Sequence, residues 1–376
     1  MTSAVAQDIY DQTEIGLIPV YQPYLAGNVS RYVNDCLESG WISSRGAFVS
    51  KFESAFAEFI GANEAASVAN GTVAIHLALS ALGIGPGDEV IVPTLTYIAT
   101  VNMVLQTGAT PVFVDSLEDT LQMDPSAVEL AVTYRTKAVM AVHLYGHPCD
   151  MTSLVALCRR HNLLLIEDCA EAFGSIFDGR HVGSFGDAAT FSFFGNKTIT
   201  TGEGGMVVTR DPEVMKRCRS LKNQGVSAIR EYWHDVLAYN YRMTNIQAAI
   251  GLAQLEIASE ILCLKVELAR AYRVGLAQLP LRTHEPIGSV RHSYWMCSVI
   301  LDRPQDRDPL RAYLAECGIE TRPFFPPTHM MPHCRVEADF PISSDLSNRG
   351  INLPSYPGLK QEHVSRICGA IRSFWG

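Results

Sequence analysis

The sequence predicts an α/β fold, in which a mainly parallel sheet forms a large domain and a smaller α+β domain follows at the C-terminal end. Strand and helix patterns alternate at short spacing from Val68 to Glu167, which is typical of a parallel sheet with helices on both faces. The length of 376 residues exceeds a single average core. We expect the large domain, with its N-terminal arm, over residues 1–255 and the small domain over 256–376.

The expected elements of the large domain mostly alternate between helix and strand along the chain. A turn rich in glycine, residues 83–88, separates the first helix from the first strand. Apolar residues cover most faces of that helix, so we expect it to be buried. In order, the elements are helix 73–82, strand 89–93, helix 99–107, strand 110–114, strand 137–143, helix 151–162 and strand 163–167.

One long helical stretch, from Asn245 to about Leu276, carries the chain into the expected small domain. Its apolar positions include Ile250, Leu252 and Leu255. The elements expected after it are strand 294–301, helix 308–316, a proline-rich loop over 322–332 and a last helix over 361–374. At the other end of the chain, Met1 to Ile15 has the composition of a polar arm.

Composition and charge exclude several classes of protein. The net charge of −9 and the absence of a run rich in Lys and Arg argue against a nucleic-acid-binding protein. No apolar run reaches the roughly 18 residues that span a bilayer, and the N-terminus lacks the basic region of a secretory signal. We therefore expect a cytoplasmic enzyme that binds neither nucleic acid nor membrane.

The cysteines and histidines do not predict a metal site. The ten cysteines are scattered and include no C-x-x-C pair, so zinc-ligand spacing is absent. Reduced thiols are then the expected state of these side chains. His143 and His147 are four residues apart, but the intervening Leu-Tyr-Gly interrupts any helix, so we expect no metal.

Lys197 is the residue around which we expect the chemistry to be built. It follows a short aromatic strand and precedes a glycine turn, while an apolar run upstream ends on Asp168. Ligands of such sheets bind at the C-terminal ends of strands. A fixed amine and a buried carboxylate at neighbouring strand ends suit pyridoxal phosphate: the amine forms a Schiff base, and the carboxylate keeps the pyridine nitrogen protonated.

Three neighbouring segments support this interpretation. Gly71 and Thr72 offer backbone N–H groups and a hydroxyl at a helix N-terminus, which suits a phosphate. Tyr97 follows a buried strand, where its ring could stack on a flat cofactor. Glu171 lies three residues after Asp168 and points the same way if a helical turn follows the strand. Taken alone, the first feature is better explained by a plain helix cap, and the second is explained equally well by an ordinary core aromatic.

The stretch 163–209 resembles the sugar-nucleotide aminotransferases of the DegT/DnrJ/StrS group, and the resemblance extends from about Ile18 to the end of the chain. Within that group, the chain is most similar to the enzymes that aminate GDP-4-keto-6-deoxymannose to GDP-perosamine. The group also contains dehydratases with His in place of the lysine, whereas this chain keeps Lys197. The supporting matches are the segments 40–44, 85–90, 142–146 and 239–249.

The resemblance implies a fold-type I aminotransferase that works as a homodimer with active sites between its subunits. It implies that Lys197 forms the Schiff base and that Asp168 contacts the pyridine nitrogen. The other implied contacts are Glu171 near the 3-hydroxyl, Tyr97 against the ring, Gly71, Thr72 and Ser192 at the phosphate, Asn240 at the phosphate from the other subunit, and Trp41, Arg242 and His329 at the substrate.

The implied reaction transfers an amino group from glutamate to a 4-keto-6-deoxy sugar nucleotide. Arg45, Ala47 and the stretch 230–235 differ from the expected pattern, so the base and the sugar epimer stay open. One alternative is an aminotransferase for another sugar nucleotide, linked to dTDP or UDP or bearing a 3-keto group. A second is a non-catalytic ligand-binding protein of the same fold.

Overall fold

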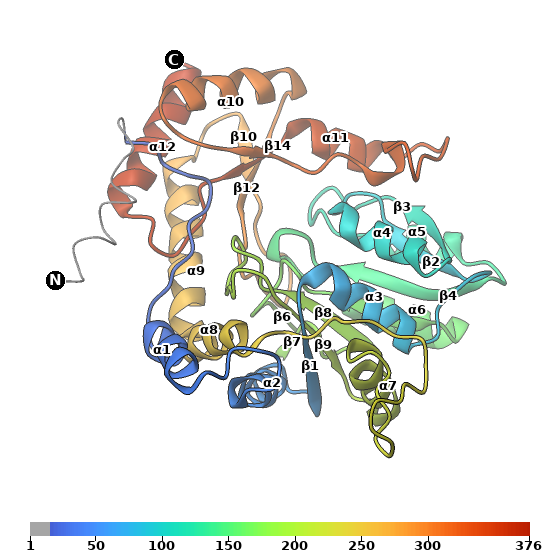
Figure 1. Cartoon of the computed structure of the whole chain (residues 1–376). Helices are drawn as coiled ribbons and strands as arrows, with labels where there is room; N and C mark the ends of the chain where they lie inside the picture. The colour runs from blue at the N-terminus through green and yellow to red at the C-terminus, as the bar shows by residue number, and fades with distance from the viewer. Residues whose placement is uncertain (1–15) are drawn as a thin grey trace.

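A seven-stranded mixed sheet forms the centre of the large domain in this computed structural model, which describes residues 16–376 (Figure 1). Four neighbouring pairs of strands are parallel, and only the two pairs that involve β9 are antiparallel. The predicted mainly parallel sheet is therefore confirmed. In spatial order the strands are β1 (Glu64–Val68), β9 (Gly205–Thr209), β8 (Ala188–Ser192), β5 (Leu164–Asp168), β4 (Thr136–Val142), β2 (Glu89–Pro93) and β3 (Thr110–Val114).

Helices cover both faces of this sheet because successive side chains of each strand point to opposite faces. In β2, Val90 and Val92 pack on one face, while Ile91 packs on the other. The first face carries α3 (Gly71–Ala81), α4 (Ile98–Gln106) and α7 (Pro212–Lys222). The second carries α2 (Ala47–Ile60), α5 (Pro125–Ala131), α6 (Met151–His161) and α8 (Asn245–Glu256), the last of which also contacts α1 (Val29–Ser39).

A four-stranded antiparallel sheet forms the small domain. Its order is β10 (Leu281–Thr283), β12 (Cys297–Leu301), β14 (Gly350–Leu353) and β13 (Arg322–Pro323). Side chains of α9 (Ala258–Gly275), α10 (Arg307–Glu316) and α12 (Gln361–Phe374) share its apolar core. The remaining elements are β6 (Ile176–Phe177), β7 (Arg180–His181), β11 (Val290–Arg291), α11 (Pro341–Arg349) and the short 3-10 helices η1 (Leu144–Gly146), η2 (Pro304–Asp306) and η3 (Thr328–Met330).

The prediction of a single helix over 245–276 is wrong, because the chain forms two helices there. Ile257 leaves the helical conformation with φ −109° and ψ 16°, and it ends α8 before α9 begins. In Figure 1, α8 lies beside the large sheet, whereas α9 runs upright toward the small domain. The domain boundary after residue 255 stays a prediction. The polar arm expected over Met1–Ile15 lies outside the described residues.

The expected strand over 294–301 is shorter at its start than predicted. Tyr294 has φ 51°, in the left-handed region that a β-strand does not use, and β12 begins only at Cys297. Two N-terminal helices, α1 and α2, were not predicted at all. Residues 16–376 contain no helix that is both long and apolar enough to span a bilayer.

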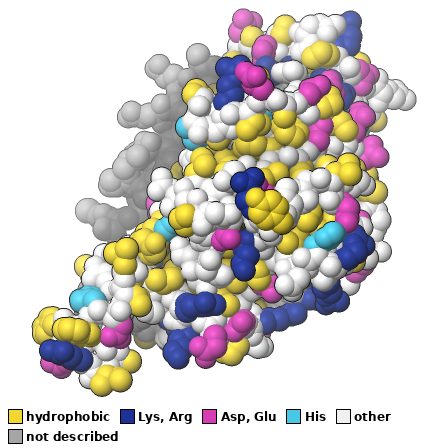
Figure 2. Space-filling view, turned by 90° about the vertical axis from the view of Figure 1, so that its right-hand side faces the viewer, with side chains coloured by type: hydrophobic (Ala, Val, Ile, Leu, Met, Phe, Trp, Pro, Cys, Tyr) yellow, Lys and Arg dark blue, Asp and Glu magenta, His cyan; other side chains and the backbone are white. Residues whose placement is uncertain are grey.

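A segment after α7 projects from the body of the large domain (Figure 1), and Figure 2 shows it as a knob that carries hydrophobic side chains. Val226 and His234 pair in an isolated bridge across this segment, and Asn223 pairs with Asn240. We call residues 223–240 the projecting hairpin. Its exposed apolar side chains are Val226, Ile229, Tyr232, Trp233, Val236 and Leu237.

Candidate active site

A cavity of about 540 Å³ lies at the C-terminal ends of the parallel strands. Strands β5 and β8 are parallel neighbours, so the residues that follow them emerge at the same edge of the sheet. The cavity brings together most of the residues that the sequence singles out. These lining residues are Gly71, Thr72, Tyr97, Asp168, Glu171, Ser192 and Lys197.

The amine of Lys197 lies between a carboxylate and an aromatic ring. Its Nζ is 3.8 Å from Oε1 of Glu171 and 3.8 Å from the ring centroid of Trp295. Burial lowers the pKa of this amine, while the negative charges of Glu171 and Asp168 act to raise it. The site therefore holds a lysine closer to its neutral, nucleophilic form than a surface lysine would be.

Asp168 is held by hydrogen bonds to both of its carboxylate oxygens. Thr100 Oγ1 donates to Oδ2 over 2.8 Å, and the backbone N–H of Ala170 donates to Oδ1 over 3.1 Å. Burial raises the pKa of Asp168, and these two donors together with Lys197 counteract part of that effect. The carboxylate thus has a fixed orientation at the end of β5.

Glu171 is a buried carboxylate with a strongly altered proton affinity. The backbone N–H of Tyr145 donates to its Oε2 over 2.9 Å. Burial raises the pKa of Glu171 to about 7, although the nearby Lys197 amine acts to lower it. Near neutral pH, this side chain therefore exists in both protonation states.

The N-terminus of α3 faces the cavity and forms a cradle together with the end of β8. Asn70 caps the helix by accepting from the N–H of Val73 over 3.0 Å, and the first N–H groups of a helix have no partner within it. A Cβ atom on Gly71 would lie 2.6 Å from the Cβ of Ser192. The close approach of α3 to β8 thus places Gly71, Thr72 and Ser192 around one concave surface, where a helix N-terminus favours an anion.

The cavity also contains polar and aromatic groups that sequence patterns did not indicate. Within the described residues, the buried Oδ1 of Asn196 has no hydrogen-bond partner, so it is free to meet a ligand. Trp295 and Phe325 line the cavity from the small-domain part of the chain. Thr100 lies one helical turn after Tyr97, and this spacing is the one sequence signal that could have placed Thr100 near the site.

Four of the predicted residues do not line this cavity. Asn240 is exposed on the projecting hairpin, and Arg242 donates to Asn223 Oδ1 over 2.9 Å. Trp41 is 57% exposed. His329 is buried, and its Nδ1 forms a 2.7 Å hydrogen bond with Thr94 Oγ1. Asn240, Arg242 and Trp41 are therefore at least partly exposed to solvent. His329 instead packs beside the end of β2.

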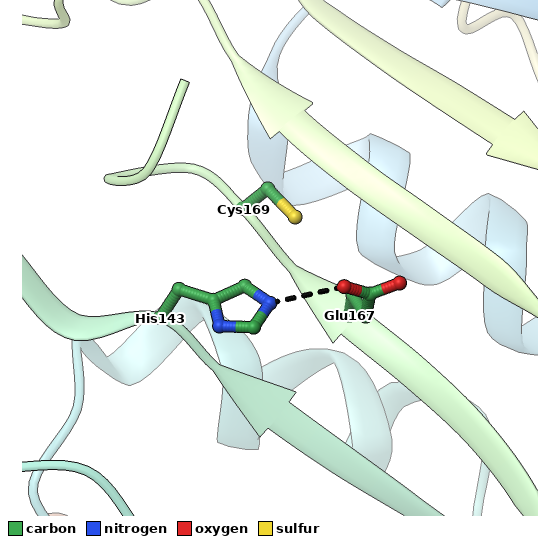
Figure 3. A group of neighbouring side chains, drawn as sticks. All are labelled: His143, Glu167 and Cys169. Carbon is green, nitrogen blue, oxygen red and sulfur yellow. Dashed lines mark hydrogen bonds and ion pairs between the residues drawn. The ribbon is translucent and has the colours of Figure 1, made fainter. Parts of the chain in front are cut away.

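Next to the cavity, His143, Glu167 and Cys169 form a buried cluster, shown in Figure 3. The N–H of Cys149 donates to Nδ1 of His143 over 3.0 Å. The proton of a neutral His143 is therefore on Nε2, from which it donates to Glu167 Oε2 over 3.2 Å. The ligand atoms of the cluster lie within 4.8 Å of one another.

Hydrogen bonds already occupy both ring nitrogens of His143 and both carboxylate oxygens of Glu167. Burial raises the pKa of Glu167, yet its bonds from His143, Gly183 and Gly186 hold the pKa below its ordinary value. A metal ion would have to displace these bonds. The cluster instead ties β4 to β5 beneath the cavity, because the backbone N–H of His143 also donates to the carbonyl of Asp168 over 3.1 Å.

Comparison with known proteins identifies a family and several similar enzymes. The DegT/DnrJ/EryC1/StrS aminotransferase family matches residues 23–372. The GDP-perosamine synthase of Escherichia coli O157:H7 is 56% identical, over 95% of this chain and 98% of its own length. That of Vibrio cholerae is 52% identical, over 96% and 99%. The crystal structure of the aminotransferase TlmJ from Streptoalloteichus hindustanus superposes with a TM-score of 0.92 at 31% identity, over 96% and 99%.

The chain belongs to the DegT/DnrJ/EryC1/StrS aminotransferase family. It is a sugar aminotransferase that depends on pyridoxal 5′-phosphate, and it has the α/β fold of such enzymes. This result decides for the enzyme over a non-catalytic ligand-binding protein. The residues present also fit the coenzyme: an amine, an opposed carboxylate, a cradle that a Cβ on Gly71 would fill, and a free acceptor on Asn196 all face one cavity.

Proposed function

We propose that the enzyme transfers an amino group from glutamate to GDP-4-keto-6-deoxymannose and so forms GDP-perosamine. The single observation that supports the chemistry is that the Lys197 amine and the Asp168 carboxylate line the same cavity as the Gly71 cradle. The sugar rests on the relatives, since those with 56% and 52% identity are GDP-perosamine synthases.

Each residue has a distinct part in this proposal. When bound, pyridoxal phosphate supplies a carbonyl that takes up the amino group and a ring that accepts electrons. Lys197 anchors the coenzyme, and its freed Nζ removes the proton from the α-carbon of glutamate. Asp168 holds a proton at the ring nitrogen, and Glu171 lies toward the 3-hydroxyl. Tyr97 covers the ring, while Gly71, Thr72 and Ser192 bind the phosphate.

We further propose a homodimer in which the partner completes each active site. Asn240 and Arg242 lie outside their own chain's cavity, beside a hairpin whose apolar side chains are exposed. Apolar surface of that kind is typical of a protein interface. In this arrangement, Asn240 reaches the partner's phosphate cradle, and Arg242, Trp41 and His329 act on the substrate side.

We propose a cytoplasmic location, which the cysteines support. All ten are unpaired thiols, the usual state in a reducing compartment.

A chemical label tests the role of Lys197. Borohydride reduction of the coenzyme-loaded enzyme, followed by peptide mapping, should place the coenzyme on Lys197, and Lys197→Ala should abolish attachment. A label on another lysine would refute the assignment. The substrate is tested with a panel of keto sugar nucleotides and glutamate, followed by mass analysis. Preferred amination of a dTDP- or UDP-linked sugar, or at carbon 3, would select the alternative substrate.

Mixed dimers test the shared site. Lys197→Ala and Asn240→Ala chains are each expected to be inactive, yet a mixture should recover part of the activity, because a hybrid dimer contains one intact site. Sedimentation of the same mixture confirms that the chains associate. If dimers form without any recovery of activity, each site is built within one chain and the proposed sharing is wrong.

A further inference from the structure

Lys265, on α9, is a fully buried lysine that takes no part in the proposed chemistry. Its Nζ donates to the carbonyl oxygen of Trp295 over 2.9 Å and to the carbonyl oxygen of Ser355. It also lies 5.5 Å from the ring centroid of Tyr21. One ammonium group thus joins three segments of the chain that are far apart in sequence.

Two of these three neighbours hold Lys197 directly. Tyr21 donates its hydroxyl proton to the backbone carbonyl of Lys197 over 2.6 Å. Trp295 donates from Nε1 to the carbonyl of Asn196 over 2.6 Å, and its ring lies under the Lys197 amine. The main chain and the amine of Lys197 are therefore both in contact with residues that Lys265 contacts in turn, Tyr21 at its ring and Trp295 at its backbone carbonyl.

Fold stability alone does not account for a charge at this position. Burial lowers the pKa of Lys265 to about 8, so the side chain still carries its charge at neutral pH. Both of its hydrogen-bond partners are carbonyl oxygens rather than carboxylates. A buried charge without an opposite charge is commonly less stabilising than a well-packed apolar side chain of similar volume.

We propose that Lys265 is a positioning residue for Lys197: its ammonium group fixes Tyr21 and Trp295, which in turn hold the main chain and the amine of Lys197. The inference rests on the proposed function only in that Lys197 is taken as the coenzyme lysine. The contacts themselves belong to the chain and do not depend on the coenzyme.

The Trp295 ring is the link through which Lys265 acts on the amine. Tyr294, directly before it, adopts a left-handed backbone with φ 51°, and Gly146 packs against the N–H groups of both residues. The hydrogen bond from the Lys265 ammonium group to the carbonyl oxygen of Trp295 holds the same backbone segment from a third side. The negative face of the indole favours a charged ammonium group, so movement of the ring away from Lys197 lowers the pKa of its amine.

The test measures the reactivity of Lys197 as a function of pH. The coenzyme-free full-length chain is treated with acetic anhydride, and acetylation of the peptide that contains Lys197 is followed by mass spectrometry. Lys265→Met should lower the midpoint of this titration by about 0.5–1 pH unit, the size expected for loss of one cation–π contact. Trp295→Leu should lower it too, and the double variant should add little, because both changes remove the same contact.

Tyr272→Phe is the matched control. Tyr272 is also buried on α9, and its hydroxyl donates to the carbonyl of Pro354 over 2.9 Å, so this change removes a buried hydrogen bond to the same loop without touching Trp295. It should leave the Lys197 midpoint unchanged. Lys265→Gln is the second variant in case Lys265→Met does not fold, and circular dichroism reports folding.

The results separate the positioning role of Lys265 from the role of Lys197 as the coenzyme lysine. An unchanged midpoint in a folded Lys265 variant overturns the proposal, and so does an equal shift in Tyr272→Phe. Failure of both Lys265 variants to fold also counts against it, since Lys265 would then be a requirement of the fold. If borohydride labels another lysine while the midpoint still shifts, the positioning of Lys197 holds and its role as coenzyme lysine fails.

Discussion

Thr100 Oγ1 donates a 2.8 Å hydrogen bond to Oδ2 of Asp168. This bond reaches from α4 across to the end of β5, so the helix that begins after Tyr97 also orients the carboxylate of the site. A carboxylate that must face a ring nitrogen benefits from such a fixed donor, since an unpaired oxygen could rotate away from the ligand.

Thr100→Val should weaken coenzyme binding. Valine has the shape of threonine but lacks the hydroxyl, so Asp168 loses a donor while staying buried, and its pKa rises further. The hydrogen bond is worth about 1.5–3 kcal/mol and is present without the coenzyme, so only the part that keeps Asp168 aimed at the ring nitrogen enters the affinity, and we expect a roughly 10-fold increase in Kd. The affinity is measured by titrating the coenzyme and following its absorbance.

Thr107→Val is the control for that experiment. Thr107 lies at the other end of α4, and its hydroxyl donates only to the carbonyl of Val104 over 2.7 Å. Its substitution should leave the Kd unchanged. An unchanged Kd for Thr100→Val as well would show that Thr100 does not orient Asp168 for the coenzyme.

Glu171→Gln should stabilise the coenzyme-free chain at high pH. Burial raises the pKa of Glu171 from 4.5 to about 7, so the folded state binds its proton more tightly than the unfolded state does. Ionisation therefore costs stability progressively as the pH rises from about 4.5 to 7, and the full cost is present above pH 7. Glutamine keeps an acceptor for the N–H of Tyr145 but cannot ionise.

The expected difference between Glu171→Gln and the wild type is close to zero near pH 4.5 and about 3 kcal/mol in favour of the variant at pH 8. Urea unfolding at a series of pH values measures it. Glu213→Gln, an exposed carboxylate on α7, should show no such trend. A difference between Glu171→Gln and wild type that does not change with pH would mean that Glu171 ionises normally in the folded chain.

Gly71→Ala should both destabilise the chain and weaken coenzyme binding. Alanine is the better helix former, so any loss must come from its Cβ, which would lie 2.6 Å from the Cβ and 2.9 Å from the Oγ of Ser192. Separating α3 from β8 to relieve this contact should cost about 1–3 kcal/mol and widen the phosphate cradle. Thermal unfolding and coenzyme titration measure the two effects.

Gly85→Ala provides the comparison, because the nearest atom to its added Cβ is the carbonyl oxygen of Thr107 at 3.7 Å. That is an ordinary contact, so stability and affinity should stay close to those of the wild type. If Gly71→Ala behaves in the same way, α3 and β8 can separate without loss, and the cradle does not depend on glycine.

The strands of the sheet could be predicted because their signals are local. The strands at residues 89–93 and 110–114 have the same bounds in the structure as in the prediction, since each is an apolar run ended by turn residues. The break at Ile257 could not be predicted, because the apolar pattern continues through it without Gly or Pro. The packing of α8 and α9 against different domains determines that break, and no local pattern records it.

The residues of the candidate site likewise fall into those that the sequence could predict and those that it could not. Asp168 and Lys197 could be predicted because each follows a strand that the sequence shows, and parallel strands end at one edge. Tyr21 and Trp295 contact Lys197 and its neighbour from 176 and 99 residues away along the chain. Periodicity reports only on neighbours along the chain, so these contacts appear only once the two domains are folded together.

Asp168→Asn tests how much of the reaction depends on a negative charge at the end of β5. Asparagine keeps the shape and can still accept from Thr100 or Ala170, so the coenzyme should still bind. It cannot hold a proton at the ring nitrogen, because a charge-assisted hydrogen bond is replaced by a neutral one. Removal of the α-proton of glutamate should then slow by on the order of a hundredfold or more.

The measurement for Asp168→Asn is a single turnover with glutamate, in which the pyridoxal form of the coenzyme is converted to its pyridoxamine form and followed by absorbance. Single-turnover rates isolate the proton transfer from product release, so coenzyme affinity and substrate exchange do not obscure the comparison. Because Asp168 is buried and its carboxylate oxygens are already held by Thr100 and Ala170, a hydrogen-bonding role within the fold is the competing explanation. Equal rates in variant and wild type would favour that explanation and would require another source for the proton at the ring nitrogen.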